Sequence, residues 1–465
     1  MNFVICLAAL FFLMTVAYRG YSVILFAPLA ALGAVLITDP SAVPPIFSGL
    51  FMEKLVGFLK LYFPVFLLGA VFGKLIEISG FARAIVSAVT GLLGTSRSII
   101  AIVLVGAILT YGGVSLFVAV FAVYPFAAEL FRQSDIPKRL IPGTIALGAF
   151  TFTMDTLPGT PQIQNIIPST FFKTNAYAAP ILGIIGSLFI FSVGIAYLEW
   201  RRRAAARHGE GYGTGHTNEP EAVEVARPIH PAVALLPLLI VGFGNKILLG
   251  VIASAYGAQA SVALSPEMAA HPVTVDVKAV TAIWAVEGAL ILGILATLIL
   301  GFRNIQGRFA EGSKAAVAGS LLAGMNTATE YGFGAVIAAL PGFKTISDGL
   351  AAIPNPLVNE AITVNVLAGV TGSASGGLSI ALAALSERFI QGAQAAGIPM
   401  EVLHRVASMA SGGMDTLPHN GAVITLLAVT GLTHRQSYGD IFAITIIKTA
   451  AVFVVIAVYY LTGIV

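Results

Sequence analysis

The pentapeptide MDTLP stands at residues 154–158 and recurs unchanged at residues 414–418. Each copy places an aspartate and a helix-breaking proline inside a long apolar stretch. The neighbouring sequence repeats in the same order, because Ile136-Pro137 recurs as Ile398-Pro399 and the GGxS element at 112–115 recurs at 376–379. A GAV tripeptide at 69–71 also recurs at 334–336. The chain therefore contains two copies of one unit.

The composition identifies the medium in which these copies fold. Of the 465 residues, 57% are hydrophobic and only 10% are charged, whereas an ordinary soluble protein has about 25% charged residues. This is the composition of a membrane protein. The net charge of +3, without a dense basic tract, gives no reason to expect nucleic acid. A single cysteine, Cys6, excludes an intramolecular disulfide framework and a cysteine-based metal or redox centre, and no cofactor is predicted.

Apolar runs long enough to cross a bilayer predict eight simple spans. Two further apolar regions, 98–168 and 355–432, are interrupted by Gly, Pro, Ser, Thr and Asp. Broken backbone at membrane depth is tolerated only where it faces protein or a watery cavity. We therefore expect each region to form a re-entrant hairpin followed by one discontinuous crossing, giving an all-α protein with ten crossings and two hairpins. The simple spans are expected near 2–16, 21–38, 55–78, 176–200, 231–255, 280–301, 316–340 and 442–461.

The distribution of Lys and Arg predicts the orientation. With both termini outside, fifteen of these residues fall inside and six fall outside, as the positive-inside rule requires. This assignment gives a first repeat at 1–200, a cytoplasmic linker at 201–229 and a second repeat at 230–465, in a bacterial inner membrane. Lys448, in the last span, is expected to snorkel to the interface. The six outside residues are Lys54, Lys173, Lys278, Lys344, Arg388 and Arg405.

The expected crossings make the two copies antiparallel, because five of them lie between equivalent points. Inverted repeats with paired broken helices are typical of secondary transporters, which bind substrate and coupling ion where the repeats meet. An old duplication retained only for packing is the alternative. That alternative does not explain why the similarity concentrates at the helix breakers.

The GGxS elements are expected at the turns of the two hairpins. Glycine permits a tight turn, and a hydroxyl beside a helix N-terminus favours an anion such as a small carboxylate. The alternative is that Gly and Ser only allow close helix packing. Polar residues after each break can donate to carboxylate and hydroxyl oxygens, although for each of them satisfying broken backbone is an equal alternative. The candidates from both groups are Gly112, Gly113, Ser115, Thr160, Gln162, Asn165, Gly376, Gly377, Ser379, His419 and Asn420.

The aspartates of the repeated pentapeptide are the candidates for ion coupling. Asp155 with Thr156, and Asp415 with Thr416, could take a proton or hold Na⁺ among freed carbonyls. A helix-capping role is the alternative. No cation lies near either aspartate in sequence, and Asp415 is the preferred proton site because His419 follows it by one helical turn. Glu330, also in an apolar span, is a further candidate; no other metal site is predicted.

At these residues the sequence resembles the gluconate permease (GntP) family of the ion-transporter superfamily. The resemblance rests on the hairpin LTYGGV at 109–114, the DIP connection at 135–137, the break LPGTP at 157–161 and a second hairpin, GSAS, at 372–375. It implies proton-coupled import of gluconate and related hydroxy acids, with Ser373 and Ser375 among the site residues. Gluconate carriers have a Pro-Pro-His-Pro-Gly-Pro break and an acidic residue after the hairpin tyrosine. The DTLPGTP break and Gly112 are more similar to the branch of β-hydroxybutyrate permeases.

Three other functions are weighed against proton-coupled carboxylate transport. A sodium-coupled carboxylate transporter differs only in the coupling ion. An anion channel would show flux that does not saturate. An intramembrane aspartyl protease would use two aspartates that share a proton on uninterrupted neighbouring helices, whereas both aspartates here precede prolines. The sequence leaves the oligomeric state open, with a homodimer as one alternative.

Overall fold

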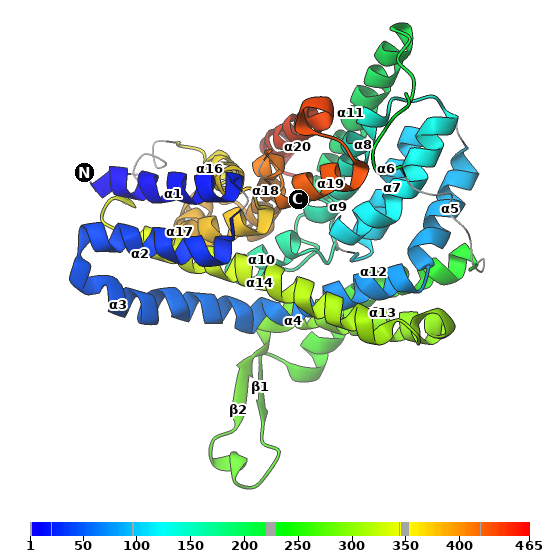
Figure 1. The fold of residues 1–465 in the computed structure, drawn as a ribbon. Helices are drawn as coiled ribbons and strands as arrows, with labels where there is room; N and C mark the ends of the chain where they lie inside the picture. Colours follow the sequence, from blue (N-terminus) through cyan, green and yellow to red (C-terminus); the bar gives the residue numbers. More distant parts are fainter. Residues whose placement is uncertain are drawn as a thin grey trace.

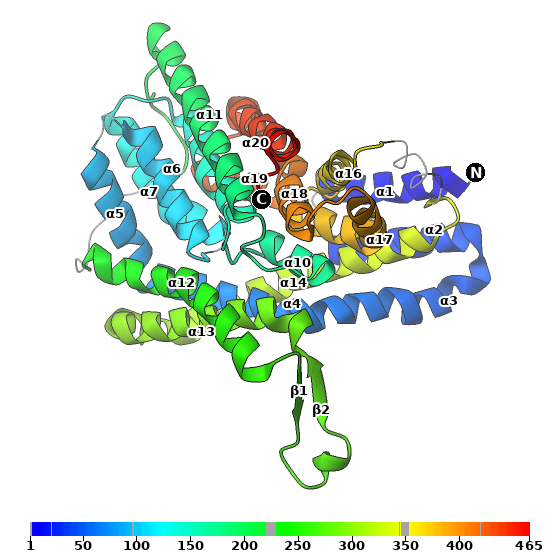
Figure 2. The ribbon, with the colours of Figure 1, turned by 180° about the vertical axis from the view of Figure 1, so that it is seen from behind.

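The computed structural model describes residues 2–19, 21–94, 97–114, 116–219, 229–343, 345, 353–418 and 420–465. These residues form helices and one antiparallel pair of short strands, β1 (Gln259–Val262) and β2 (Val273–Asp276) (Figures 1 and 2). The expected helical membrane protein is confirmed. The strand pair was not predicted, and it projects away from the helices.

Among the described residues, five helical runs are long and apolar enough to cross a membrane, and each overlaps a predicted span. α14 (Phe309–Ala339) has 31 residues and covers a sixth predicted span. The shorter helices α1 (Asn2–Tyr18) and α2 (Val23–Thr38) cover the first two. The total of ten crossings stays a prediction. The five runs are Pro40–Ile78, which ends in α4 (Met52–Ile78), α11 (Pro180–Arg207), α12 (Pro231–Tyr256), α13 (Val277–Ile305) and α20 (His434–Thr462).

The long helices α4, α12, α13 and α14 lie side by side as one layer (Figure 1). Helices from the two halves of the sequence pack on each other, because α2 contacts α14 and α4 contacts α13. α4 and α14, which carry the repeated GAV tripeptide, are in direct contact, and so are α11 and α20. The two halves of the chain therefore interleave rather than standing apart.

Each interrupted region folds as a helix pair followed by a broken helix. In the first region, α6 (Ser98–Tyr111) and α7 (Leu116–Gln133) are joined at Gly112 and Gly113, where Gly113 has a φ of +92°. In the second region, α16 (Pro356–Thr371) and α17 (Ala374–Ala395) are joined at Gly372, which has a φ of +65°.

The second turn is not where the glycine pair predicts it. Gly376 and Gly377 lie in the first turn of α17 rather than at the hairpin tip. A Cβ on Gly377 would come within 2.2 Å of the backbone of Ala368, so this glycine lets α16 and α17 pack closely. At Gly377 the structure therefore shows the close helix packing of the alternative interpretation.

The broken helices have the same plan in both regions. After α8 (Ile141–Ala149) the chain forms the single turn α9 (Phe152–Asp155), loses helical structure, and resumes as α10 (Ile163–Phe172). After α18 (Met400–Ser411) it forms a 3₁₀ turn at Met414–Thr416 and resumes as α19 (Gly421–Thr430). The predicted interruptions at both MDTLP copies are confirmed. We call residues 150–162 break 1 and residues 412–420 break 2.

The two broken helices run in opposite directions. Along α18, His404 contacts Thr174, whereas Ser408, further along the chain, donates to the Asp155 carbonyl. α18 therefore runs antiparallel to residues 155–174. The second part of each broken helix packs against the other interrupted region. α10 packs on α17 and α18, and α19 packs on α7 and α8.

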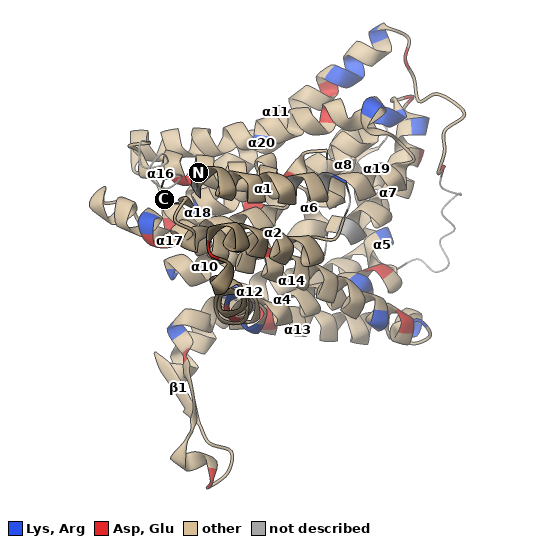
Figure 3. Cartoon of the chain, turned by 60° about the vertical axis from the view of Figure 1, so that its left-hand side comes forward, with Lys and Arg blue, Asp and Glu red and all other residues tan. Residues whose placement is uncertain are grey.

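Basic residues gather at one end of the helices. Figure 3 shows most of them where α11 ends and near α5 (Phe81–Leu93) and the end of α13, while both termini and the strands lie toward the other end. Ion pairs join this end, including Arg139 with Glu210 and Arg201 with Asp440. Arg405 does not follow the predicted charge distribution, because it lies in the interior and is 0% exposed.

Candidate functional site

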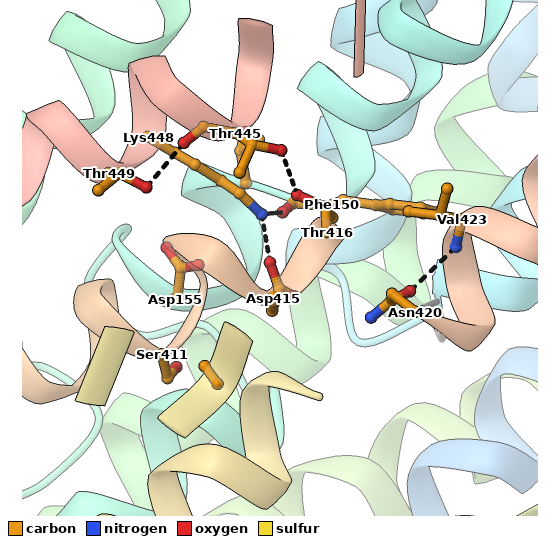
Figure 4. Close-up of polar contacts among 12 residues, drawn as sticks. Phe150, Asp155, Ser411, Asp415, Thr416, Asn420, Val423, Thr445, Lys448 and Thr449 are labelled. Atoms are coloured by element: carbon orange, nitrogen blue, oxygen red, sulfur yellow. Dashed lines mark hydrogen bonds and ion pairs between the residues drawn. The ribbon is translucent and has the colours of Figure 1, made fainter. Parts of the chain in front are cut away.

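The two breaks bring Asp155 and Asp415 into the same buried region (Figure 4). Asp155 is 2% exposed and Asp415 is 5% exposed. Asp155 ends the short helix α9, and Asp415 lies in the 3₁₀ turn of break 2. Two carboxylates taken out of water are costly unless cations or hydrogen bonds compensate them.

Lys448 of α20 supplies one cation. Its Nζ atom lies 2.5 Å from Asp415 Oδ1 and 3.3 Å from the carbonyl oxygen of Phe150, the residue that caps the C-terminus of α8 (Figure 4). The expectation that Lys448 snorkels to the interface is wrong, since its side chain is 3% exposed. The lysine is held inside because it joins break 1 to the carboxylate of break 2.

Arg405 of α18 supplies the second cation. Its guanidinium donates to the carbonyl oxygens of Ala176, Ala178 and Asp155 and to Asn165 Oδ1, over distances of 2.7–3.5 Å. Its placement in an outside loop is therefore wrong. Arg405 satisfies one carbonyl of break 1 and two carbonyls of the connection between α10 and α11, and none of these hydrogen bonds is to a carboxylate.

Asp155 is only partly satisfied. Its Oδ1 atom accepts a hydrogen bond from Thr156 Oγ1 at 2.5 Å, but its buried Oδ2 atom has no hydrogen-bond partner among the residues that the structure describes. A Cβ on Gly412 would lie 1.7 Å from Oδ2, so glycine at this position lets the carboxylate lie directly against break 2. Gly413 plays the same part for Asn365, whose Oδ1 atom also lacks a partner.

These contacts overturn one premise of the sequence argument. Neither aspartate has a cation nearby in sequence, yet Lys448 and Arg405 reach the breaks across 33 and 250 residues. The absence of a cation is the reason for expecting a proton or a metal ion on both aspartates, and Lys448 removes that reason for Asp415. The preference for Asp415 over the aspartate of break 1 rests on His419, which lies outside the described residues, as does Ser115.

Several predicted binding side chains are used to hold the breaks and turns together. Gln162 donates to the carbonyls of Thr110 and Val114 at the first hairpin turn, and Asn420 donates to the carbonyl of Gly372 at the second. Tyr111, which the sequence did not single out, ties the first turn to Pro158. The remaining contacts are Thr160 with the Thr153 carbonyl, Asn165 with the carbonyls of Thr160 and Ala176, Ser373 with the Gly376 amide, Ser375 with Thr327, and Thr416 with Thr445.

Other candidates keep buried polar atoms that have no hydrogen-bond partner among the described residues. Ser379 Oγ is one, and Glu330 Oε2, which lies against Gly376, is another. Outside the predicted set, Thr110 Oγ1, Asn365 Oδ1 and both carboxylate oxygens of Glu360 share this property. An unsatisfied buried polar group costs about 1–3 kcal/mol, so such a group is a candidate for contact with a ligand. Gly112 and Gly113 pack against Leu238 and Pro161.

Paired charges and hydrogen bonds make up this site. Within the described part of the chain, no group of three or more His, Cys, Asp or Glu side chains is arranged to hold a metal ion. The breaks instead gather two carboxylates, two cations and several free oxygens.

Comparison with known proteins assigns the family. No family model matches the sequence. A protein of Bacillus subtilis (strain 168), named as the uncharacterized transporter YxjC, is 58% identical over 476 aligned residues that cover 100% of both chains. The chain belongs to the family of this transporter. The broken helices and buried charges therefore lie in a member of a membrane transporter family.

Two further likenesses are more limited. The crystal structure of the YdaH transporter of Alcanivorax borkumensis has a TM-score of 0.53 and covers 91% of this chain and 90% of its own, at 15% identity. That likeness shows a shared fold. An uncharacterized transporter of Haemophilus influenzae is 44% identical over 73 residues, which are 16% of this chain.

Proposed function

We propose that the protein is a secondary active transporter that carries a small carboxylate together with a proton across the bacterial inner membrane. The observation that supports this most directly is the group of four buried charges where the antiparallel breaks meet. Paired broken helices in opposed repeats are the usual setting for substrate and coupling ion in such carriers. We further infer that residues 1–200 and 230–465 are the two inverted repeats, joined by a cytoplasmic linker.

The charges suggest how proton and anion are coupled. With both aspartates ionised, Asp155 and Asp415 balance Lys448 and Arg405, so the region is formally neutral. A proton on Asp155 leaves one positive charge, which one carboxylate of the substrate would neutralise. A charge that crosses low-dielectric surroundings uncompensated is costly, and therefore only the empty state and the doubly loaded state should move easily.

Asp155 is the better proton site of the two. Its Oδ2 atom has no hydrogen-bond partner within the described part of the chain, so a proton can be added there without breaking a contact seen in the structure. Asp415, by contrast, would lose its ion pair with Lys448. That pair also argues against an aspartyl protease, in which the two carboxylates share a proton.

The substrate class is inferred from the surrounding groups and from the resemblance to gluconate permeases. Free hydroxyl and amide oxygens, such as those of Ser379, Thr110 and Asn365, suit a substrate with hydroxyl groups beside its carboxylate. We therefore propose a hydroxy acid, either a gluconate-like sugar acid or 3-hydroxybutyrate. The transport activity is non-enzymatic in this proposal.

The test is uptake of labelled short hydroxy acids by vesicles containing the purified protein. A pH gradient and a sodium gradient are imposed separately, and the proton proposal requires accumulation with the pH gradient alone. Asp155→Asn should abolish this accumulation while leaving exchange of labelled for unlabelled substrate (counterflow), because exchange requires no net proton movement. Asp276→Asn, the same change at the exposed N-cap of α13, serves as the matched control.

Different outcomes would contradict different parts of the proposal. Accumulation driven only by sodium would replace the proton as the coupling ion. Flux that neither saturates nor accumulates substrate would indicate a channel. Wild-type accumulation by Asp155→Asn would remove Asp155 from the coupling site.

A further inference from the structure

The contacts of Lys448 resemble those of a bound metal ion. Among the described residues, its Nζ atom donates hydrogen bonds to two oxygen atoms, Asp415 Oδ1 and the carbonyl oxygen of Phe150. Phe150 caps the C-terminus of α8, where the helix dipole is negative. The hydroxyl groups of Thr445 and Thr449 lie on the same face of α20 as Lys448 (Figure 4). The Thr445 hydroxyl is hydrogen-bonded to the Thr416 hydroxyl of break 2.

Many carriers coordinate a sodium ion at a site of this kind, which is lined by oxygen atoms at the end of a broken helix. A carboxylate, a carbonyl at a helix C-terminus and nearby hydroxyls are ligands that hard cations prefer. We propose that the Lys448 ammonium is a tethered cation that occupies this place, so that the carrier needs no metal ion to join its two breaks. This proposal rests on the proposed function, because it explains why the coupling would use a proton and not sodium.

The charged groups around Lys448 define what its removal would do. Asp155 and Asp415 lie in the breaks, Arg405 and His404 lie on α18, and Glu360 lies on α16, which also packs against α20. Without the ammonium, Arg405 is the one cation that the described residues leave beside the two break aspartates. A buried carboxylate that has lost its partner is strongly unfavourable, and the space left by the lysine side chain gives a small cation access to the same oxygens.

The proposal therefore predicts that Lys448→Ala gains a sodium requirement that the wild type lacks. Sodium replaces choline in the buffer, and substrate counterflow is measured in reconstituted vesicles. Counterflow by Lys448→Ala should rise by roughly tenfold or more with sodium and should saturate, since a difference of about tenfold corresponds to only 1.4 kcal/mol. Wild-type counterflow should be the same in both buffers.

A second measurement needs no substrate. Sodium should raise the Tm of purified Lys448→Ala, because a ligand that binds only the folded state stabilises it by mass action. It should leave the wild-type Tm unchanged. The matched control is the double variant Lys448→Ala/Asp415→Asn, which removes both members of the ion pair and should respond to sodium in neither assay.

The outcomes separate this inference from the proposed function. If Lys448→Ala is recovered in folded form in sodium but not in choline, that result supports the proposal that Lys448 is a tethered cation. Equal behaviour of Lys448→Ala in the two buffers, in recovery, Tm and counterflow, overturns it, and so does a sodium requirement in the wild type. Failure of the wild type to accumulate any hydroxy acid would instead refute the proposed function, and the Tm comparison would still decide the role of Lys448.

Discussion

Gly412→Ala tests whether the coupling site depends on direct contact between the two breaks. Gly412 has helical backbone angles (φ −81°, ψ −5°), so alanine fits its conformation and only the added methyl group matters. That methyl would lie 1.7 Å from Asp155 Oδ2, whereas a relaxed carbon–oxygen contact is about 3.3 Å. The carboxylate or break 2 must therefore move by about 1.6 Å.

The cost of this movement sets the expected effect. Overpacking a buried site costs about 1–3 kcal/mol, which corresponds to roughly 5- to 150-fold in an equilibrium. We expect uptake driven by a pH gradient to fall within that range, and to fall more than counterflow, because the displaced group is the proposed proton site. Initial rates in vesicles, normalised to the amount of reconstituted protein, measure both.

Gly421→Ala is the matched control for this experiment. Gly421 begins α19 just after the same break, but a Cβ there would meet no atom within 4 Å. Its transport should equal that of the wild type. If Gly412→Ala also transports normally at an unchanged Tm, the close contact between Asp155 and break 2 has no functional part, and the reasoning fails.

Three further predictions concern orientation, packing and pH. A cysteine at Thr214, with Cys6→Ser, should not react with an impermeant outside reagent in intact cells; reaction would reverse the proposed topology. Gly377→Ala should destabilise the folded protein by about 1–3 kcal/mol, seen as a lower Tm, because its methyl meets the α16 backbone at 2.2 Å; an unchanged Tm would contradict the packing role. The Arg139 guanidinium lowers the pKa of the Glu210 carboxyl. The ionised Glu210 should therefore stabilise the folded protein at neutral pH, and this contribution should be lost as pH falls through the folded-state pKa. The Tm difference between wild type and Glu210→Gln should accordingly vanish in acid, and a constant difference would exclude this linkage.

The interruptions and the repeat could be predicted because they are local features of the sequence. Proline removes a backbone donor and disfavours a continuous helix, so the two MDTLP copies predict the breaks without knowledge of the partners. Proline alone is not sufficient, because Pro64 and Pro237 lie inside the long helices α4 and α12. The glycine pair at 376–377 predicts the second hairpin turn at the wrong position, because glycine permits both tight turns and close helix packing. The strand pair was missed although Val273–Asp276 alternates β-branched and polar residues, a pattern typical of strands.

The partners of the aspartates could not be predicted in the same way. Helical periodicity gives the face on which a residue lies but not which distant helix faces it. Lys448 was therefore assigned to the interface and Arg405 to a loop, since a charge in an apolar stretch usually avoids the bilayer. The expected span 442–461 places Lys448 near its start, whereas α20 begins eight residues earlier, at His434, so that Lys448 lies at the middle of the helix and too far from its ends for easy snorkelling.

The packing of each broken helix against the other interrupted region has a consequence for synthesis and membrane insertion of the chain. The carbonyl of Ala178 is satisfied by Arg405, which is synthesised 227 residues later. Until α18 has been made, the first half of the protein holds polar backbone that lacks its final partner within the membrane. The nascent chain should therefore need shielding by the insertion machinery or by water, and truncation before residue 400 should leave a product that quality-control proteases degrade.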